Sequence, residues 1–426
     1  MTQKRYTLLN SILILIGIIL LYEVVRNSMR DGDFVGYVLA GNDVLNGQYL
    51  YGSYLNTWPP LFSIFSVVLA FGDKFSPFFI RFIWLSGSVI SIYFIVAETV
   101  KLIFKKSLSL RPRGHHALPQ DPIILIPLLI ILRFVLDNLA NLQINIFLLL
   151  GAILSIRFFI EKKYVWVGLL LGLTISLKVY PIFILFYFLY KREFKPVLWT
   201  FLFIVVLNSV SFLVFGFEQA IFYYQHWASE VAPKSYIANH KNQSLFGMFL
   251  RLYTSEDPGH DLHVNILSLK PYSTKVLTYG FILISSLVPA YLFRKRFQDR
   301  SDLCALLQYS ILFTAIPLLS PISWKAYFVF QWVPYFLLYT ILFRSRTKLP
   351  TRTLWFMKVA FGLSVVLHIG SAEIIAGRYF SDVLEAYSAI TIGSIVLLLV
   401  QLYAFVQLKK FDLETVHLQS VTRHEV

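Results

Sequence analysis

Long apolar runs, separated by short polar segments, dominate the sequence. Most of these runs are long enough to cross the roughly 30 Å hydrocarbon core of a bilayer as a helix of about 20 residues. They lie at residues 8–25, 58–72, 77–104, 122–136, 142–160, 164–190, 196–216, 275–293, 303–320, 326–343, 353–371 and 387–408. The pattern predicts an all-α polytopic membrane protein of about twelve transmembrane helices.

The first apolar run follows Lys4 and Arg5 and could be mistaken for a secretory signal peptide. Its apolar stretch is longer than the corresponding part of a signal peptide, and no small-residue cleavage site follows it. We therefore expect residues 8–25 to form an uncleaved first span, with the N-terminus in the cytoplasm.

Composition and charge agree with a membrane protein and argue against a nucleic-acid-binding one. Hydrophobic residues make up 57% of the chain and charged residues 14%, whereas soluble domains carry about 25% charged residues. The net charge of +15 is concentrated in short basic clusters between apolar runs, as in cytoplasmic loops. We expect membrane lipids, and no nucleic acid, as partners.

The basic clusters also predict the orientation of the chain. Twelve spans place residues 28–57, 217–274 and 320–326 outside, and residues 191–195, 294–302, 344–352 and the tail 409–426 in the cytoplasm. The loop 105–121 is basic although it falls outside, so either it is an exception to this rule or the short runs 122–136 and 142–160 are not simple spans. The spans follow one another closely, which predicts a single transmembrane domain over residues 1–426.

The first outer loop, residues 28–57, contains a candidate catalytic carboxylate. Apolar residues from Phe34 to Leu45 recur at helical spacing, which predicts a short helix on the membrane surface. Asp33 precedes this helix, where a carboxylate is electrostatically favourable. Two interpretations are open at this point: Asp33 caps the helix, or it performs chemistry.

A lysine inside an apolar run is the second candidate. Lys178 lies within the run 164–190, beside Pro181, which breaks the helix there. A charged side chain at membrane depth is costly and needs a partner. Lys178 either pairs with a carbonyl group that Pro181 frees, or binds a buried anionic headgroup.

The large outer loop, residues 217–274, offers weaker candidates. Its amides and hydroxyl at Asn242-Gln243-Ser244 suit sugar hydroxyl groups, and they also suit an ordinary turn. The segment Gly259-His260-Asp261-Leu262-His263 is only weakly similar to a metal site, and we interpret it as a solvated loop. We predict no metal site.

The order of these motifs resembles a known family. The motifs are Asp33, Tyr37, Gly47-Gln48-Tyr49-Leu50-Tyr51, Trp58-Pro59-Pro60, Gln143-x-Asn145, Lys178-x-x-Pro181, Asn242-Gln243-Ser244 and Ser320-Pro321-x-Ser323-Trp324. Together they resemble the polyprenyl-phosphate-sugar-dependent glycosyltransferases of family 87, in the GT-C superfamily. The resemblance covers roughly residues 30–330.

The resemblance implies transfer of a sugar, mannose in the known members, from a polyprenyl-phosphate sugar to a glycolipid or glycan acceptor. It implies a multi-pass protein of the bacterial inner membrane whose active site faces the periplasm or exterior. A lipid-monophosphate donor implies no metal and no other cofactor. The reaction requires a base for the acceptor hydroxyl group and positive charge for the departing phosphate.

The resemblance also suggests roles for individual residues. Asp33 is the expected catalytic base. The expected donor and phosphate ligands are Lys178, Lys325, Tyr327 and Arg251. The expected substrate-binding residues are Tyr37, Tyr51, Trp58, Asn242, Gln243, Ser244 and Trp324. Gln143 and Asn145 match the family without an assigned role.

Two departures from the family pattern bear on activity. Leu142 stands where the family has a glycine before Gln-x-Asn, and Ala326 and Tyr327 stand where it has histidines. The alternatives to a transferase are a transporter or flippase of a lipid-linked sugar or anion, and an inactive family member that acts as a scaffold.

Overall fold

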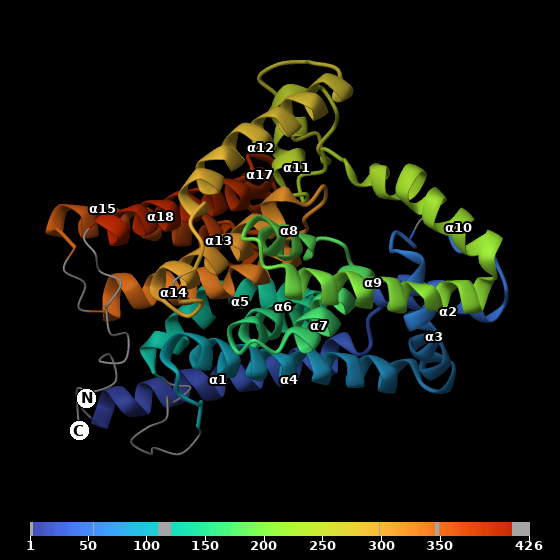
Figure 1. Cartoon of the computed structure of the whole chain (residues 1–426), viewed down its shortest axis with the longest axis horizontal. Helices are drawn as coiled ribbons and strands as arrows, with labels where there is room; N and C mark the ends of the chain where they lie inside the picture. Colours follow the sequence, from blue (N-terminus) through green and yellow to red (C-terminus); the bar gives the residue numbers. More distant parts are fainter. Residues whose placement is uncertain (1–2, 54, 110–120, 298, 346–348, 411–426) are drawn as a thin grey trace. The chain divides into compact units, whose positions relative to one another are not determined.

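The computed structural model describes residues 3–53, 55–109, 121–297, 299–345 and 349–410. Within these ranges the chain is built from helices and contains no β-strand (Figure 1). Most of the basic loop 105–121 and of the predicted tail 409–426 lies outside the described residues. The structure confirms the prediction of an all-α polytopic membrane protein.

The helices follow one another with short connections. They are α1 (Gln3–Asn27), α2 (Phe34–Leu45), α3 (Pro60–Phe75), α4 (Pro77–Phe104), α5 (Pro122–Ala140), α6 (Asn145–Ile160), α7 (Tyr164–Leu177), α8 (Ile182–Tyr190), α9 (Phe194–Phe215), α10 (Phe217–His226), α11 (Leu245–Tyr253), α12 (Pro271–Phe293), α13 (Leu303–Leu319), α14 (Trp332–Tyr339), α15 (Thr351–Gly370), α16 (Glu373–Ala376), α17 (Arg378–Ala386) and α18 (Ala389–Lys410). Short helical segments at Trp227–Val231, Ala232–Ser235, Lys325–Gln331 and Thr340–Arg344 extend or precede their neighbours.

Every predicted apolar run contains a helix, but the helices differ in length. Among the described residues, eight helical segments are long and apolar enough to cross a membrane: Thr7–Asn27, Pro77–Phe104, Pro122–Ala140, Phe194–Phe215, Pro271–Phe293, Lys325–Arg344, Thr351–Gly370 and Ala389–Lys409. The other predicted runs form α3, α6 and α13, of 16, 16 and 17 residues, and the pair α7 and α8, of 14 and 9 residues. These helices are shorter than the usual span of about 20 residues, so the total of twelve spans stays a prediction.

The described chain forms two compact units, each assembled from segments that are distant in sequence. The Asp33 unit consists of Ser11–Glu98 and Val135–Ser235, and the Arg251 unit consists of Met1–Asn10, Thr99–Phe134 and Tyr236–Val426. We name each unit after one polar residue that it contains, Asp33 or Arg251. The sequence predicted one domain and gave no boundary between these two units, because each unit combines segments that are distant in sequence.

The predicted surface helix forms α2, with the expected bounds, and packs on α3 in the Asp33 unit (Figure 1). The two helices approach closely because residue 41 is a glycine. A Cβ atom at this position would lie 2.3 Å from the Ser66 carbonyl oxygen. Tyr37 is fully buried on this side of α2, with its ring 4.7 Å from that of Trp58. Trp58 in turn stacks on Phe62. Tyr37 and Trp58, expected to bind substrate, therefore pack in an aromatic core.

The helix break predicted at Pro181 is confirmed. Helix α7 ends at Leu177, Lys178 is extended (φ −156°, ψ 113°), and α8 begins at Ile182. Helix α7 packs closely against α9 because Gly168 has no side chain. A Cβ atom there would lie 2.5 Å from the backbone of Trp199. The break therefore lies at the end of a firmly packed helix.

Arg251 on α11 organises the other unit. Its guanidinium group is buried, with 1% of the residue exposed. Nε donates to the Ala386 carbonyl (3.0 Å), Nη1 donates to the carbonyls of Asn239 (2.8 Å) and Asn242 (2.7 Å), and Nη2 donates to the Ser388 hydroxyl (2.6 Å). These bonds join the loop before α11 to the corner between α17 and α18. The expected phosphate ligand is thus occupied by the protein itself, because its donors satisfy backbone carbonyls.

The motif Asn242-Gln243-Ser244 is also part of the framework. All three residues are fully buried. The Asn242 amide oxygen accepts from the Ser323 backbone N–H (2.9 Å), and the Ser244 hydroxyl donates to the Pro321 carbonyl (3.1 Å). Gln243 donates to the Glu385 carbonyl (2.7 Å). The groups expected to bind sugar instead hold the Ser-Pro-x-Ser-Trp segment and α17 in place.

The structural assignment of Arg251 predicts a loss of stability on substitution. Arg251→Met would leave several buried carbonyl groups unpaired, at about 1–3 kcal/mol for each group. We expect the free energy of unfolding to fall by about 3 kcal/mol or more, measured by thermal unfolding of the detergent-solubilised chain. Arg294→Met, at an exposed arginine that bonds the carbonyl of Tyr291, is the matched control and should unfold like the unmodified chain. Wild-type stability of Arg251→Met, combined with weaker donor binding, would instead restore the phosphate-ligand assignment.

Candidate active site

Asp33 does not use its carboxylate to cap helix α2. It occupies the N-cap position, but its side chain accepts no capping hydrogen bond. Instead, its Oδ2 atom accepts a hydrogen bond of 2.8 Å from Nε2 of Gln143. Of the two interpretations that the sequence left open, the geometry disfavours the cap.

Two unusual backbone conformations bring the loops of Asp33 and Gln143 together. Gly32 has φ +51°, and a Cβ atom there would lie 2.8 Å from the Asn141 carbonyl oxygen. That same carbonyl accepts from the Asp33 backbone N–H at 3.0 Å. Leu142, where the family has glycine, has φ +50°, a region that glycine adopts most easily. Leu142 therefore adopts, as a buried leucine, a backbone conformation that favours glycine.

A chain of side-chain hydrogen bonds leads from Asp33 to Lys178. The Gln143 amide oxygen accepts from Asn145 Nδ2 (2.5 Å), and the Asn145 amide oxygen accepts from Lys178 Nζ (3.2 Å) and from the Tyr180 hydroxyl (2.9 Å). Because Lys178 can only donate, the direction of each amide is determined, and each passes a donated hydrogen bond toward Asp33. We call these four residues, Asp33, Gln143, Asn145 and Lys178, the relay. It gives Gln143 and Asn145, which sequence matching left without a role, a positioning function.

The electrostatics of the relay favour proton acceptance at Asp33. Burial raises the pKa of the Asp33 carboxyl above its ordinary value, and the positive charge of Lys178 partly lowers it again. A carboxyl with a raised pKa is a stronger base than an exposed aspartate while it is ionised. The relay thus combines a proton acceptor with a cation that can face an anion.

Asp31, two residues earlier, has a different environment. Its carboxylate is 79% exposed and lies 3.2 Å from the guanidinium group of Arg81. It is an exposed ion-pair partner, whereas Asp33 belongs to a partly buried polar chain.

Other candidates lie in the same unit. The Tyr51 hydroxyl donates to the Trp58 carbonyl (3.1 Å), and its ring lies 5.7 Å from that of His226. A cavity of about 470 Å³ is lined mainly by apolar side chains, including Val179, Ile204, Phe212 and Trp227. Val179 follows Lys178 directly, so apolar space borders the segment that carries the cation.

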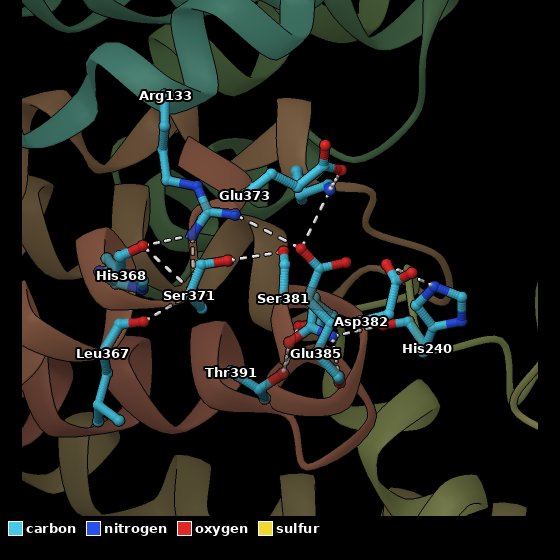
Figure 2. Close-up of polar contacts among 12 residues, drawn as sticks. Arg133, His240, Leu367, His368, Ser371, Glu373, Ser381, Asp382, Glu385 and Thr391 are labelled. Carbon is cyan, nitrogen blue, oxygen red and sulfur yellow. Dashed lines mark hydrogen bonds and ion pairs between the residues drawn. The ribbon is translucent and has the colours of Figure 1, made fainter. Parts of the chain in front are cut away.

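The remaining predicted residues form a separate cluster in the Arg251 unit. Lys325 Nζ lies 3.0 Å from Oε1 of the fully buried Glu385. Nη2 of Arg133 lies 3.4 Å from the same oxygen (Figure 2). Trp324 is partly buried and Tyr327 is buried. Lys325, expected to face phosphate, therefore shares a carboxylate with a second cation.

Sequence reasoning missed Glu385 and the second cation that shares it, Arg133. Arg133 lies in the apolar run 122–136, where an ionisable residue indicates a function or a buried partner, as we argued for Lys178. Arg133 also donates to the Ser371 hydroxyl (2.6 Å) and to the His368 carbonyl (Figure 2). Glu385 lies on the amphipathic helix α17, and no local pattern links it to Lys325.

Comparison with known proteins agrees with the geometry. Residues 56–321 match the family model described as glycosyltransferase family 87. No curated protein and no solved structure gives a significant match. The matched segment contains Gln143, Asn145 and Lys178 of the relay and begins after Asp33. Because the match covers more than half of the chain, this protein belongs to glycosyltransferase family 87 and is a membrane glycosyltransferase.

Proposed function

We propose that the chain transfers a sugar, mannose, from a polyprenyl-phosphate donor to a glycolipid or glycan acceptor, with Asp33 as the general base. The observation that supports this proposal most strongly is the relay. Its carboxylate is free of a capping role, is held by Gln143, and lies at the opposite end of a hydrogen-bonded chain from Lys178.

The proposed reaction is a single displacement. The acceptor hydroxyl oxygen attacks the anomeric carbon of the donor while Asp33 takes the hydroxyl proton. The bond between the anomeric carbon and the phosphate oxygen breaks, and the lipid phosphate leaves with the bonding electron pair. The positive charge of Lys178 stabilises the charge that develops on this phosphate. In this proposal no metal or other cofactor takes part.

The apolar cavity supports a lipid donor. A polyprenyl chain needs an apolar surface beside the site that holds its phosphate, because hydrocarbon is favourably buried away from water. Val179 lines the cavity of about 470 Å³, and the neighbouring Lys178 supplies the charge for the phosphate.

The membrane orientation forms part of the proposal. The basic segments at 191–195, 294–302 and 344–352 support a cytoplasmic location for those loops. The loop of Asp33 would then face the periplasm of a bacterial inner membrane, where a lipid-linked sugar and a cell-envelope acceptor meet.

Substitution of the two aspartates tests the base. Asp33→Asn keeps the acceptor for the Gln143 hydrogen bond but removes the basic group. We expect turnover to fall by about 100-fold or more, since general bases contribute 10²–10⁴-fold. The measurement is transfer of labelled sugar from polyprenyl-phosphate sugars to a membrane lipid extract by the purified chain.

Asp31→Asn is the matched control because it removes an exposed carboxylate two residues away. It should retain nearly full turnover. An inactive Asp31→Asn variant beside an active Asp33→Asn variant would assign the base to Asp31. No labelled product from the unmodified chain with any donor would favour the inactive scaffold or the transporter.

Removing the cation tests the donor site. Lys178→Met keeps the aliphatic part of the side chain and deletes one charged hydrogen-bond donor, which contributes about 1.5–3 kcal/mol. We expect kcat/KM for the donor to fall by roughly 10- to 100-fold in steady-state assays. Lys163→Met, at an exposed lysine that pairs with Glu161, should have no such effect. Unchanged donor kinetics in Lys178→Met would leave this lysine with a structural role.

A further inference from the structure

Three metal-binding side chains converge in the Arg251 unit, separate from the relay residues. His240 lies in the loop before α11, His260 lies in the loop after it, and Asp382 lies on α17. One ligand atom from each lies within 4.8 Å of the others. Figure 2 shows the ring of His240 next to Asp382.

The ring of His240 is oriented as in a metal ligand. Its Nδ1 atom lies 2.9 Å from the Pro258 carbonyl oxygen, so Nδ1 carries the proton that it donates. Histidine ligands in metal sites commonly donate their second N–H to a carbonyl in this way, which leaves Nε2 as the ligand atom. Here Nε2 is buried, and among the described residues it has no hydrogen-bond partner.

A carboxylate, that of Asp382, lies beside Nε2 of His240. Its Oδ1 atom lies 3.4 Å from Nε2 of His240. In a neutral ring protonated at Nδ1, the Nε2 lone pair repels a carboxylate oxygen, and a cation between the two atoms would attract both. Two ligand atoms on a tetrahedral zinc ion are about 3.3 Å apart, given zinc–ligand distances of roughly 2.0–2.1 Å. The observed separation fits a shared cation better than it fits a direct hydrogen bond.

The surrounding backbone holds two of these ligands in place. The Pro258 carbonyl also accepts from the His240 backbone N–H (2.8 Å), and Gln243 donates to the His240 carbonyl (2.5 Å). On the other side, Ser381, next to Asp382, donates to the Ser371 carbonyl (2.9 Å). His260 is exposed, so its side chain can rotate to reach the shared position.

We propose that His240, His260 and Asp382 bind one divalent zinc-like cation, with water as the fourth ligand. This inference is independent of the proposed reaction and differs from our expectation of no metal site. The cation would fasten the two loops around α11 to α17, the helix that also carries Glu385. It would join three protein segments that are distant in sequence.

Metal titration of the purified full-length chain tests the proposal. After treatment with a chelator and dialysis, Zn²⁺ is added and binding is measured by calorimetry, with thermal unfolding followed in parallel. We expect one saturable site and a higher unfolding temperature with Zn²⁺. Loss of a residue that only hydrogen-bonds to a metal ligand lowers metal affinity by roughly 10–100-fold. His260→Ala removes a ligand itself, so it should weaken zinc binding by more than this and abolish the zinc-dependent stabilisation.

His260→Ala is the decisive variant because its exposed side chain can be removed without disturbing the core. His263→Ala is the matched control, since it removes an exposed histidine from the same loop and should bind like the unmodified chain. Asp382→Asn should behave like His260→Ala. Absence of a saturable site in the folded unmodified chain would overturn the proposal. Loss of binding in His263→Ala alone would also overturn it, because it would place the metal at the exposed group Asp257, Asp261 and His263.

Discussion

The hydrogen bond between Gln143 and Asp33 is the interaction on which the proposed active site depends. It removes the carboxylate from the helix N-terminus that would otherwise use it, and it requires close approach of two loops. Gly32 and Leu142 permit that approach through left-handed backbone conformations. Left-handed geometry is costly for leucine, so burial of the Leu142 side chain and the bond from Trp84 to its carbonyl help to offset the strain.

The polar groups inside this protein fall into two classes, which differ in their hydrogen-bond partners. Arg251 and the Asn242-Gln243-Ser244 motif bond mainly to backbone carbonyl and N–H groups and thereby hold loops together. The relay consists of side chains bonded to side chains, and it ends in a carboxylate and an ammonium group. A partly buried network whose ends are oppositely charged is costly unless all its members are satisfied, which fits a site that is kept for chemistry.

The apolar pattern of the sequence predicted the helices of the twelve apolar runs but not α10, α11, α16 and α17, and polar interruptions predicted two local features. Helix α2 and the break at Lys178 follow from helical periodicity and from the backbone restriction at Pro181. The convergence of Asp33 and Lys178 was suggested only by the order of family motifs. Their actual connection through Gln143 and Asn145 depends on loop conformations that a sequence does not display.

The differences between the expected and the observed surroundings of these residues have a common physical cause. Residue type indicates which hydrogen bonds a side chain can make, but it does not indicate whether backbone carbonyls already use them, as they do at Arg251. Tyr37 and Trp58 were assigned to substrate from the family resemblance, whereas ring packing buries them. The pairs Lys325–Glu385 and His240–Asp382 join distant segments, and no local spacing reports such contacts.

The pH dependence of kcat/KM tests most directly whether Asp33 is the base and is coupled to Lys178. Burial raises the pKa of Asp33, and Lys178 lowers it again. Activity should therefore fall as the pH drops through the pKa of Asp33, which lies above the ordinary aspartate value. In Lys178→Met, whose residual activity remains measurable, this fall should occur at higher pH, because the charge that favours the ionised carboxylate is gone. A profile whose acidic side is unchanged in Lys178→Met, or displaced to lower pH, would contradict the account.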